Sequence, residues 1–135
     1  MKSPHRYAPY AVAALLVLVL VPTGLAAKGG NGRSATDPSL SLVTLDSTDG
    51  MPHWGQQVTF NVNTNATWPY VEVDCAQGGS WVYAQILEYP FGGQTFTLKS
   101  YWWTGGAADC SATLFTTGKN GSRTTLATAT FHVDA

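Results

Sequence analysis

The sequence has little charge and few cysteines, and each shortage excludes some classes of binding partner or cofactor. Only 11% of the 135 residues are charged, and the net charge is −1 at pH 7. Proteins that bind nucleic acid or anionic lipid need a basic surface, so we expect neither as a partner. The two cysteines are too few to form a zinc site by themselves, because such sites take four ligands. No metal and no other cofactor is predicted.

Long apolar runs are also missing, apart from one near the N-terminus. Lys2 and Arg6 precede an uncharged run of about 11 residues, which is followed by Pro22 and small residues. This order is typical of a secretory signal peptide. The run is shorter than the roughly 20 residues that a membrane-spanning helix needs. We therefore expect a signal peptide over residues 1–26, cleaved after Ala26 or alternatively after Ala27, and no membrane span in the mature chain.

The mature chain has the size of one domain. Removing residues 1–26 leaves 109 residues, with five basic and eight acidic side chains, and this length suits a single core. Residues 27–39 are polar and rich in Gly and Ser, which predicts a flexible linker before a domain at 40–135. No hydrophobic or basic anchor follows Val133, so we expect the protein to be free in the extracellular space.

Both cysteines, Cys75 and Cys110, lie in the exported part of the chain. An exported chain with two cysteines most simply forms one disulfide. Closing a loop of about 36 residues would stabilise the fold by roughly 4 kcal/mol in the chain-entropy model.

From residue 40 onward, short runs of β-branched and aromatic residues alternate with turn residues, and no helical period is present. Alternation predicts inward faces that include Val58, Val71, Val73, Cys75 and Leu114. Seven antiparallel strands in under 100 residues favour an all-β, two-sheet sandwich. The predicted strands are 40–45, 57–63, 70–76, 81–87, 95–100, 110–117 and 124–133.

The strand count, the domain size and a cysteine pair on a mid-chain and the penultimate strand resemble the immunoglobulin-like domains of exported bacterial proteins. The resemblance covers residues 40–135 and implies an immunoglobulin-like sandwich in which the third and sixth strands are neighbours. Antibody-type domains carry their first cysteine on the second strand and a tyrosine two residues before the second. Here Cys75 falls on the third predicted strand, and Ala108 occupies the tyrosine position.

Aromatic residues are in surplus, with five Trp, four Tyr and five Phe in the mature chain. Phe60, Phe96, Phe115 and Phe131 lie among apolar partners and are assigned to the core. Large aromatics outside a core stack on sugar rings or anchor protein interfaces. The surplus therefore indicates a binding surface.

The first candidate surface lies in the run SWVYAQILEY. Trp81, Tyr83 and Gln85 alternate with Val82, Ala84 and Ile86. If the second set points inward, Trp81 and Tyr83 are exposed side by side with Gln85 next in line.

The second candidate surface is Tyr101-Trp102-Trp103, which precedes Gly105-Gly106. Neighbouring strand residues point to opposite faces, so at least one of the two tryptophans should be buried and at least one near the surface. The glycine pair would let the chain turn a corner before Cys110.

Catalytic patterns are weak. His132 and Asp134 are more simply an exposed polar pair, and Glu72 with Asp74 a solvated strand face, than an acid-base pair. Residues 46–50 match no complete calcium loop and are typical of a turn. The leading hypothesis is a secreted, non-enzymatic domain that binds an extracellular protein or surface. The alternative is a carbohydrate-binding module with Trp81, Tyr83 and Trp102 or Trp103 as stacking rings, guided by Gln85 or Glu72.

Overall fold

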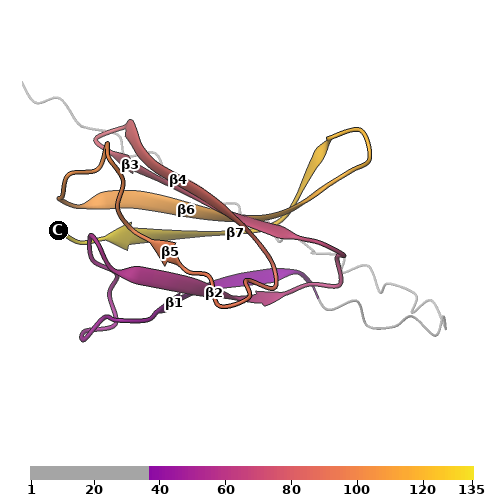
Figure 1. The fold of residues 1–135 in the computed structure, drawn as a ribbon, viewed down its shortest axis with the longest axis horizontal. Coiled ribbons are helices and arrows are strands. Elements are labelled where there is room, and N and C mark those ends of the chain that lie inside the picture. Colours follow the sequence, from indigo (N-terminus) through magenta and orange to yellow (C-terminus); the bar gives the residue numbers. More distant parts are fainter. Residues whose placement is uncertain (1–36) are drawn as a thin grey trace, which may run out of the picture. The chain divides into compact units, whose positions relative to one another are not determined.

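The computed structural model describes residues 37–135, which form two antiparallel sheets stacked as layers (Figure 1). One sheet has the order β1-β2-β5, made of Ser39–Thr44, Gln57–Asn63 and Phe96–Thr97. The other has the order β4-β3-β6-β7, made of Ser80–Glu88, Tyr70–Gln77, Ala108–Thr117 and Arg123–Val133. The predicted sandwich of seven antiparallel strands is confirmed.

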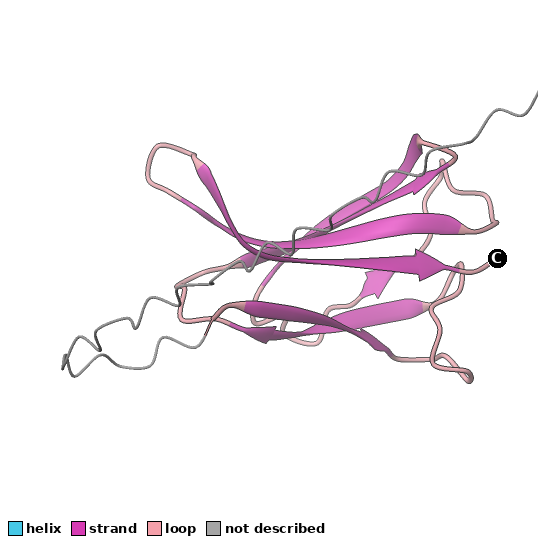
Figure 2. Ribbon diagram, turned by 180° about the vertical axis from the view of Figure 1, so that it is seen from behind, coloured by secondary structure: helices cyan, strands magenta, loops and turns pink. Residues whose placement is uncertain are grey.

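Strands and loops account for all of residues 37–135 (Figure 2). This stretch therefore holds no helix that could cross a membrane. The predicted signal peptide at 1–26, and the predicted linker up to residue 36, lie outside the described residues.

The core lies between the inner faces of the two sheets, because alternate residues of each strand are apolar. Val58 of β2, Val71 and Val73 of β3 and Leu114 of β6 are fully buried, as the alternation predicts. Phe60 meets Phe96 edge to face, with ring centroids 5.5 Å apart. No buried side-chain nitrogen or oxygen of the described residues lacks a hydrogen-bond partner.

The predicted disulfide joins β3 to β6. Cys75 lies directly opposite Cys110 in the sheet register, with the two Cα atoms 4.1 Å apart. The bond therefore ties two neighbouring strands of one sheet, whereas antibody-type domains link their two sheets. β3 and β6 are neighbours in the four-stranded sheet.

The fifth strand is shorter than predicted. The sequence predicts strand from 95 to 100, but only Phe96 and Thr97 are paired as a strand. Leu98 still donates its N–H to the carbonyl of Gln56 (2.8 Å), and then the N–H of Lys99 turns back to the carbonyl of Thr97 (2.7 Å). This three-residue turn ends the strand and sends the chain to the other sheet.

The predicted exposure of Tyr83 is wrong. Trp81 pairs with Ala76 and Tyr83 with Cys75, so Val82 has no partner and forms a β-bulge. A bulge adds one residue to one strand and reverses the alternation beyond it. Val82 and Tyr83 are both buried, while Ala84 and Ile86, expected inside, are exposed.

Phe115 is buried, but it does not belong to the cluster of side chains between the sheets. It stacks on Tyr70, with ring centroids 5.6 Å apart, and the guanidinium carbon of Arg123 lies 3.5 Å from its ring centre. Its predicted burial is therefore confirmed, although Tyr70 and Arg123 cover it instead of the side chains between the sheets.

Candidate functional site

The outer face of the four-stranded sheet carries a row of four residues, one from each strand. Trp81 of β4 lies opposite Ala76 of β3, which lies opposite Asp109 of β6, which lies opposite His132 of β7. Because neighbouring strands are about 4.8 Å apart, the row spans roughly 14 Å. The small side chain of Ala76 leaves a depression between the large side chains of Trp81 and His132 at the two ends of the row.

The next row along the strands supplies polar groups to the same depression. Asp74 of β3 lies opposite Ser111 of β6, which lies opposite Thr130 of β7. The depression has a volume of about 640 Å³ and is open to solvent. We call it the outer groove, and the side chains that define it are those of Asp74, Trp81, Asp109, Ser111, Thr130 and His132.

Trp81 stands at one end of the outer groove, and the residue is 59% exposed. The indole Nε1 donates to Oδ1 of Asp74 at 3.4 Å. Partial burial raises the pKa of Asp74, and the hydrogen bond from Trp81 partly opposes this rise. The indole is therefore held on one side by a carboxylate, while most of its surface remains free.

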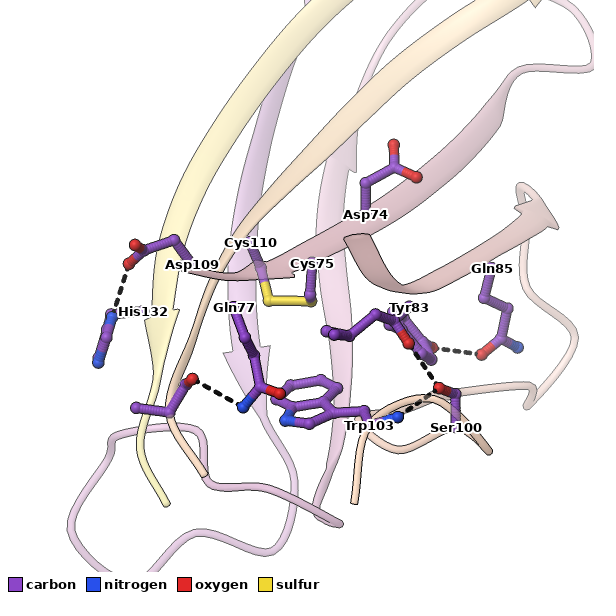
Figure 3. Close-up of a disulfide and its surroundings, with 12 residues drawn as sticks. Asp74, Cys75, Gln77, Tyr83, Gln85, Ser100, Trp103, Asp109, Cys110 and His132 are labelled. Carbon is purple, nitrogen blue, oxygen red and sulfur yellow. Dashed lines mark hydrogen bonds and ion pairs between the residues drawn. A yellow bond between two sulfur atoms is a disulfide. The ribbon is translucent and has the colours of Figure 1, made fainter. Parts of the chain in front are cut away.

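His132 stands at the opposite end. Its Nδ1 is 2.7 Å from Oδ1 of Asp109, and its Nε2 is 3.8 Å from Oδ1 of Asp134. The side chain of Asp109 is 88% exposed, so its second oxygen can meet a ligand in the groove. Figure 3 shows this pair, and it shows Asp74 on the side of β3 opposite to Cys75.

Glu72, which the sequence suggests as a polar contact for a bound sugar, is already engaged with another side chain. Its carboxylate forms an ion pair with Arg123, the residue that covers Phe115. Glu72 therefore contributes to the packing beside the outer groove and does not line it.

The second candidate surface lies on residues 99–107, which we call the corner segment. Tyr101 is 84% exposed and Trp102 69% exposed, and their rings meet edge to face at 5.1 Å. Trp103 is fully buried, and its Nε1 donates to the carbonyl of Gly106 at 3.0 Å. The exposed tryptophan of the pair is therefore Trp102, and Trp103 cannot serve as a stacking ring.

Two polar side chains hold the corner segment against the four-stranded sheet (Figure 3). Ser100 Oγ donates to the carbonyl of Val82 (2.5 Å) and accepts the backbone N–H of Trp102 (3.1 Å). Gln77 Nε2 donates to the carbonyls of Gly105 (2.8 Å) and Ala107 (3.0 Å). Trp102 is thereby tied to the edge of β4 at the residue that follows Trp81.

The predicted site residues thus separate into two groups. Trp81, Tyr101 and Trp102 are on the surface, whereas Tyr83 packs against Trp103 inside, with ring centroids 6.1 Å apart. Gln85 is half-buried, because its Oε1 accepts the hydroxyl of Tyr83 at 2.6 Å. It cannot guide a ligand at the surface while it makes this bond.

Sequence reasoning did not assign Asp109, Ser111 or Thr130 to a site. Alternation along β7 does predict that Thr130 and His132 lie on the outer face, so the contribution of this strand could be predicted. The register of three strand pairs brings Thr130 and His132 next to Asp74 and Trp81. This register cannot be predicted from the residue types alone.

The predicted turn at residues 46–50 is held by hydrogen bonds to the carboxylate of Asp49. Asp49 Oδ1 accepts from the N–H of Met51 (2.9 Å) and the hydroxyl of Ser47 (2.8 Å), and its Oδ2 lies 2.9 Å from His53 Nε2. These bonds, led by the one from Met51, lower the pKa of Asp49. In residues 37–135, no group of three or more His, Cys, Asp and Glu side chains is arranged to hold a metal ion.

Comparisons with protein-family models, with curated protein sequences and with solved structures give no match. The outer groove and the corner segment are therefore the features that bear on function.

Proposed function

We propose that the domain is a secreted, non-enzymatic binding module and that its ligand is an extracellular saccharide held in the outer groove. The exposed indole of Trp81 carries this proposal, because it stands at the end of a groove in which side chains with oxygen atoms lie, namely those of Asp74, Asp109, Ser111 and Thr130. The saccharide was the alternative hypothesis from the sequence, and the position of Trp81 favours it.

A sugar ring has an apolar face of C–H groups and a rim of hydroxyls, so it needs a flat apolar surface beside hydrogen-bonding groups. Trp81 provides the surface. Asp74, Ser111 and Thr130 provide acceptors and donors along the floor of the groove. Hydrogen bonds to an ionised carboxylate are roughly twice as strong as those between neutral groups, so Asp74 would fix the orientation of the ring.

The size of the outer groove suits a small or chain-like ligand. Pockets for small molecules usually measure about 300–1,000 Å³, and the groove lies within this range at about 640 Å³. The centres of protein interfaces are depleted of charged residues. Two carboxylates, those of Asp74 and Asp109, line the groove, which argues against a protein at this place.

The side chains suggested for catalysis are engaged in ways that support a non-enzymatic function. Glu72 is paired with Arg123. The two histidines of residues 37–135, His53 and His132, each bond to an aspartate, and no Ser or Thr hydroxyl of this range hydrogen-bonds to either ring. A nucleophile needs such a base beside it.

A second candidate function, protein binding, is supported by the Tyr101–Trp102 pair. Both rings are largely exposed and in contact with each other, and aromatic side chains of this kind often dominate the binding energy of protein interfaces.

Depletion of the protein from solution by a panel of insoluble polysaccharides tests the proposal. We expect at least one polysaccharide to bind, and Trp81→Ala to weaken this binding at least about tenfold, as loss of a binding hot spot does. Trp102→Ala is the matched control, because it also removes one exposed indole. Binding that survives Trp81→Ala, or that is lost only with Trp102→Ala, would move the site to the corner segment. No binding to any polysaccharide would refute a saccharide ligand.

A further inference from the structure

The charges around the outer groove are nearly all of one sign. Asp74 and Asp109 line it, and no Lys or Arg of the described residues does. We infer that the groove selects saccharides with protonated amino groups over neutral and acidic saccharides, an inference that rests on the function proposed above.

Apart from His132, which is already paired with Asp109 at 2.7 Å, no basic side chain of the described residues lines the groove. Residues 37–135 contain eight acidic and only three basic side chains. Of the three, Arg123 is paired with Glu72, and Lys119 lies in the turn between β6 and β7, at the opposite end of β6 from Asp109. Lys99 precedes Ser100 in the corner segment and does not line the groove. A ligand in the groove therefore meets a negative potential.

Asp74 and Trp81 together form a suitable place for an ammonium group. The indole Nε1 lies 3.4 Å from the carboxylate, so an amino group on a sugar stacked against Trp81 can reach that carboxylate. The negative face of an indole also attracts cations, and the attraction increases as the site loses water. Both contacts favour a positive charge at the same point.

The surroundings of Asp74 make its charge costly in the free protein. The carboxyl is partly buried, and Glu72 adds a second negative charge on the same face of β3, so its pKa is raised. Trp81 and Arg123 oppose this rise. A bound ammonium would add to their effect, whereas a sugar carboxylate or sulfate would meet repulsion from Asp74 and Asp109.

The test compares two ligands with the same backbone, a β-1,4-linked glucosamine hexamer and its fully N-acetylated form. Acetylation removes the charge and leaves the chain and its linkage unchanged. At mildly acidic pH and about 0.15 M salt, where exposed charges are screened beyond about 8 Å, we expect the glucosamine hexamer to bind at least about fivefold more tightly by calorimetry.

Asp74→Asn tests the residue that would make the contact. The asparagine keeps an oxygen acceptor for the indole N–H of Trp81 but has no charge, so it should abolish the preference for the glucosamine hexamer. Glu88→Gln is the matched control, because it removes the same charge from the exposed far end of β4 and should keep the preference. Asp109→Asn, at an exposed position, should reduce the preference and provides a second variant.

Each outcome is decisive. Equal binding of the two hexamers, with both lost in Trp81→Ala, would overturn the inference and leave the saccharide site standing. An equal loss of preference in Glu88→Gln and Asp74→Asn would show that only net charge matters, and this would also overturn the inference. Failure to bind the hexamers, a neutral glucan and an acidic polysaccharide alike would refute the proposed function, and the inference with it.

Discussion

The two adjacent tryptophans of the corner segment should differ sharply in their effect on stability. Trp103 is fully buried, packs edge to face on Tyr83, and donates its indole N–H to Gly106. Its carbonyl accepts the indole N–H of Trp54 at 3.0 Å. Trp102 is 69% exposed, and its indole makes no such bond. The substitutions Trp103→Ala and Trp102→Ala therefore remove the same atoms from opposite environments.

The magnitudes follow from burial. Truncating a buried tryptophan to alanine costs about 3–5 kcal/mol, whereas surface changes usually stay within about 0.5 kcal/mol. In a domain of this size each kcal/mol lowers Tm by about 4–8 °C, so Trp103→Ala should lower it by at least about 12 °C. Trp103→Phe keeps a ring but loses the bond to Gly106, and it should fall between the other two variants.

Urea unfolding followed by far-ultraviolet circular dichroism measures these differences without relying on tryptophan fluorescence. The phenylalanine variant keeps the comparison usable if Trp103→Ala is too unstable to fold. A cost for Trp102→Ala equal to that for Trp103→Ala would refute the reasoning, since it would mean that both rings contribute to the core.

Two further predictions concern the disulfide and the turn at Asp49. Replacing both Cys75 and Cys110 with alanine should lower the free energy of unfolding by about 4 kcal/mol through the lost loop constraint alone, as measured by urea unfolding; a loss below about 1 kcal/mol would contradict this. The hydrogen bond to Asp49 raises the pKa of His53 above 6.5, so their pairing stabilises the fold below pH 6.5 and is lost as pH rises through the raised value. Because the pKa of Asp49 is lowered, its contribution persists down to strongly acidic pH. Asp49→Asn should therefore lower Tm more at pH 5 than at pH 9, and an equal loss at both would exclude the ion pair.

Much of the fold could be predicted because strand signals are local. Apolar alternation located β2 without error and placed Val71, Val73 and Cys75 on the inside. The disulfide could be predicted from the expected signal peptide and the count of cysteines. The fifth strand was predicted too long, because the turn after Leu98 depends on a backbone bond that the residue types do not reveal.

The candidate site could be predicted only in part, because it depends on register. One unpaired residue, Val82, reverses the faces of β4, so Trp81 was correctly placed on the surface and Tyr83 wrongly. In the corner segment, alternation required one buried tryptophan but could not say which. Two hydrogen bonds determine that Trp103 is the buried one. The bond of Ser100 reaches Val82, 18 positions away, and the bond of the Trp103 indole reaches Gly106 across a turn, so neither could be predicted from local residue types.

The disulfide has a consequence for the outer groove, although it lies on the opposite face of the sheet. Cys75 and Cys110 are the inward neighbours of Asp74 and Asp109, and their bond fixes β3 against β6 at this level. A slip of one residue between two strands would turn every side chain to the other face. The covalent link forbids such a slip, so it acts as a fixed spacer that keeps Asp74 beside Ser111 and Ala76 beside Asp109. The geometry of the outer groove is thus set by a bond between side chains on the inner face of the same sheet.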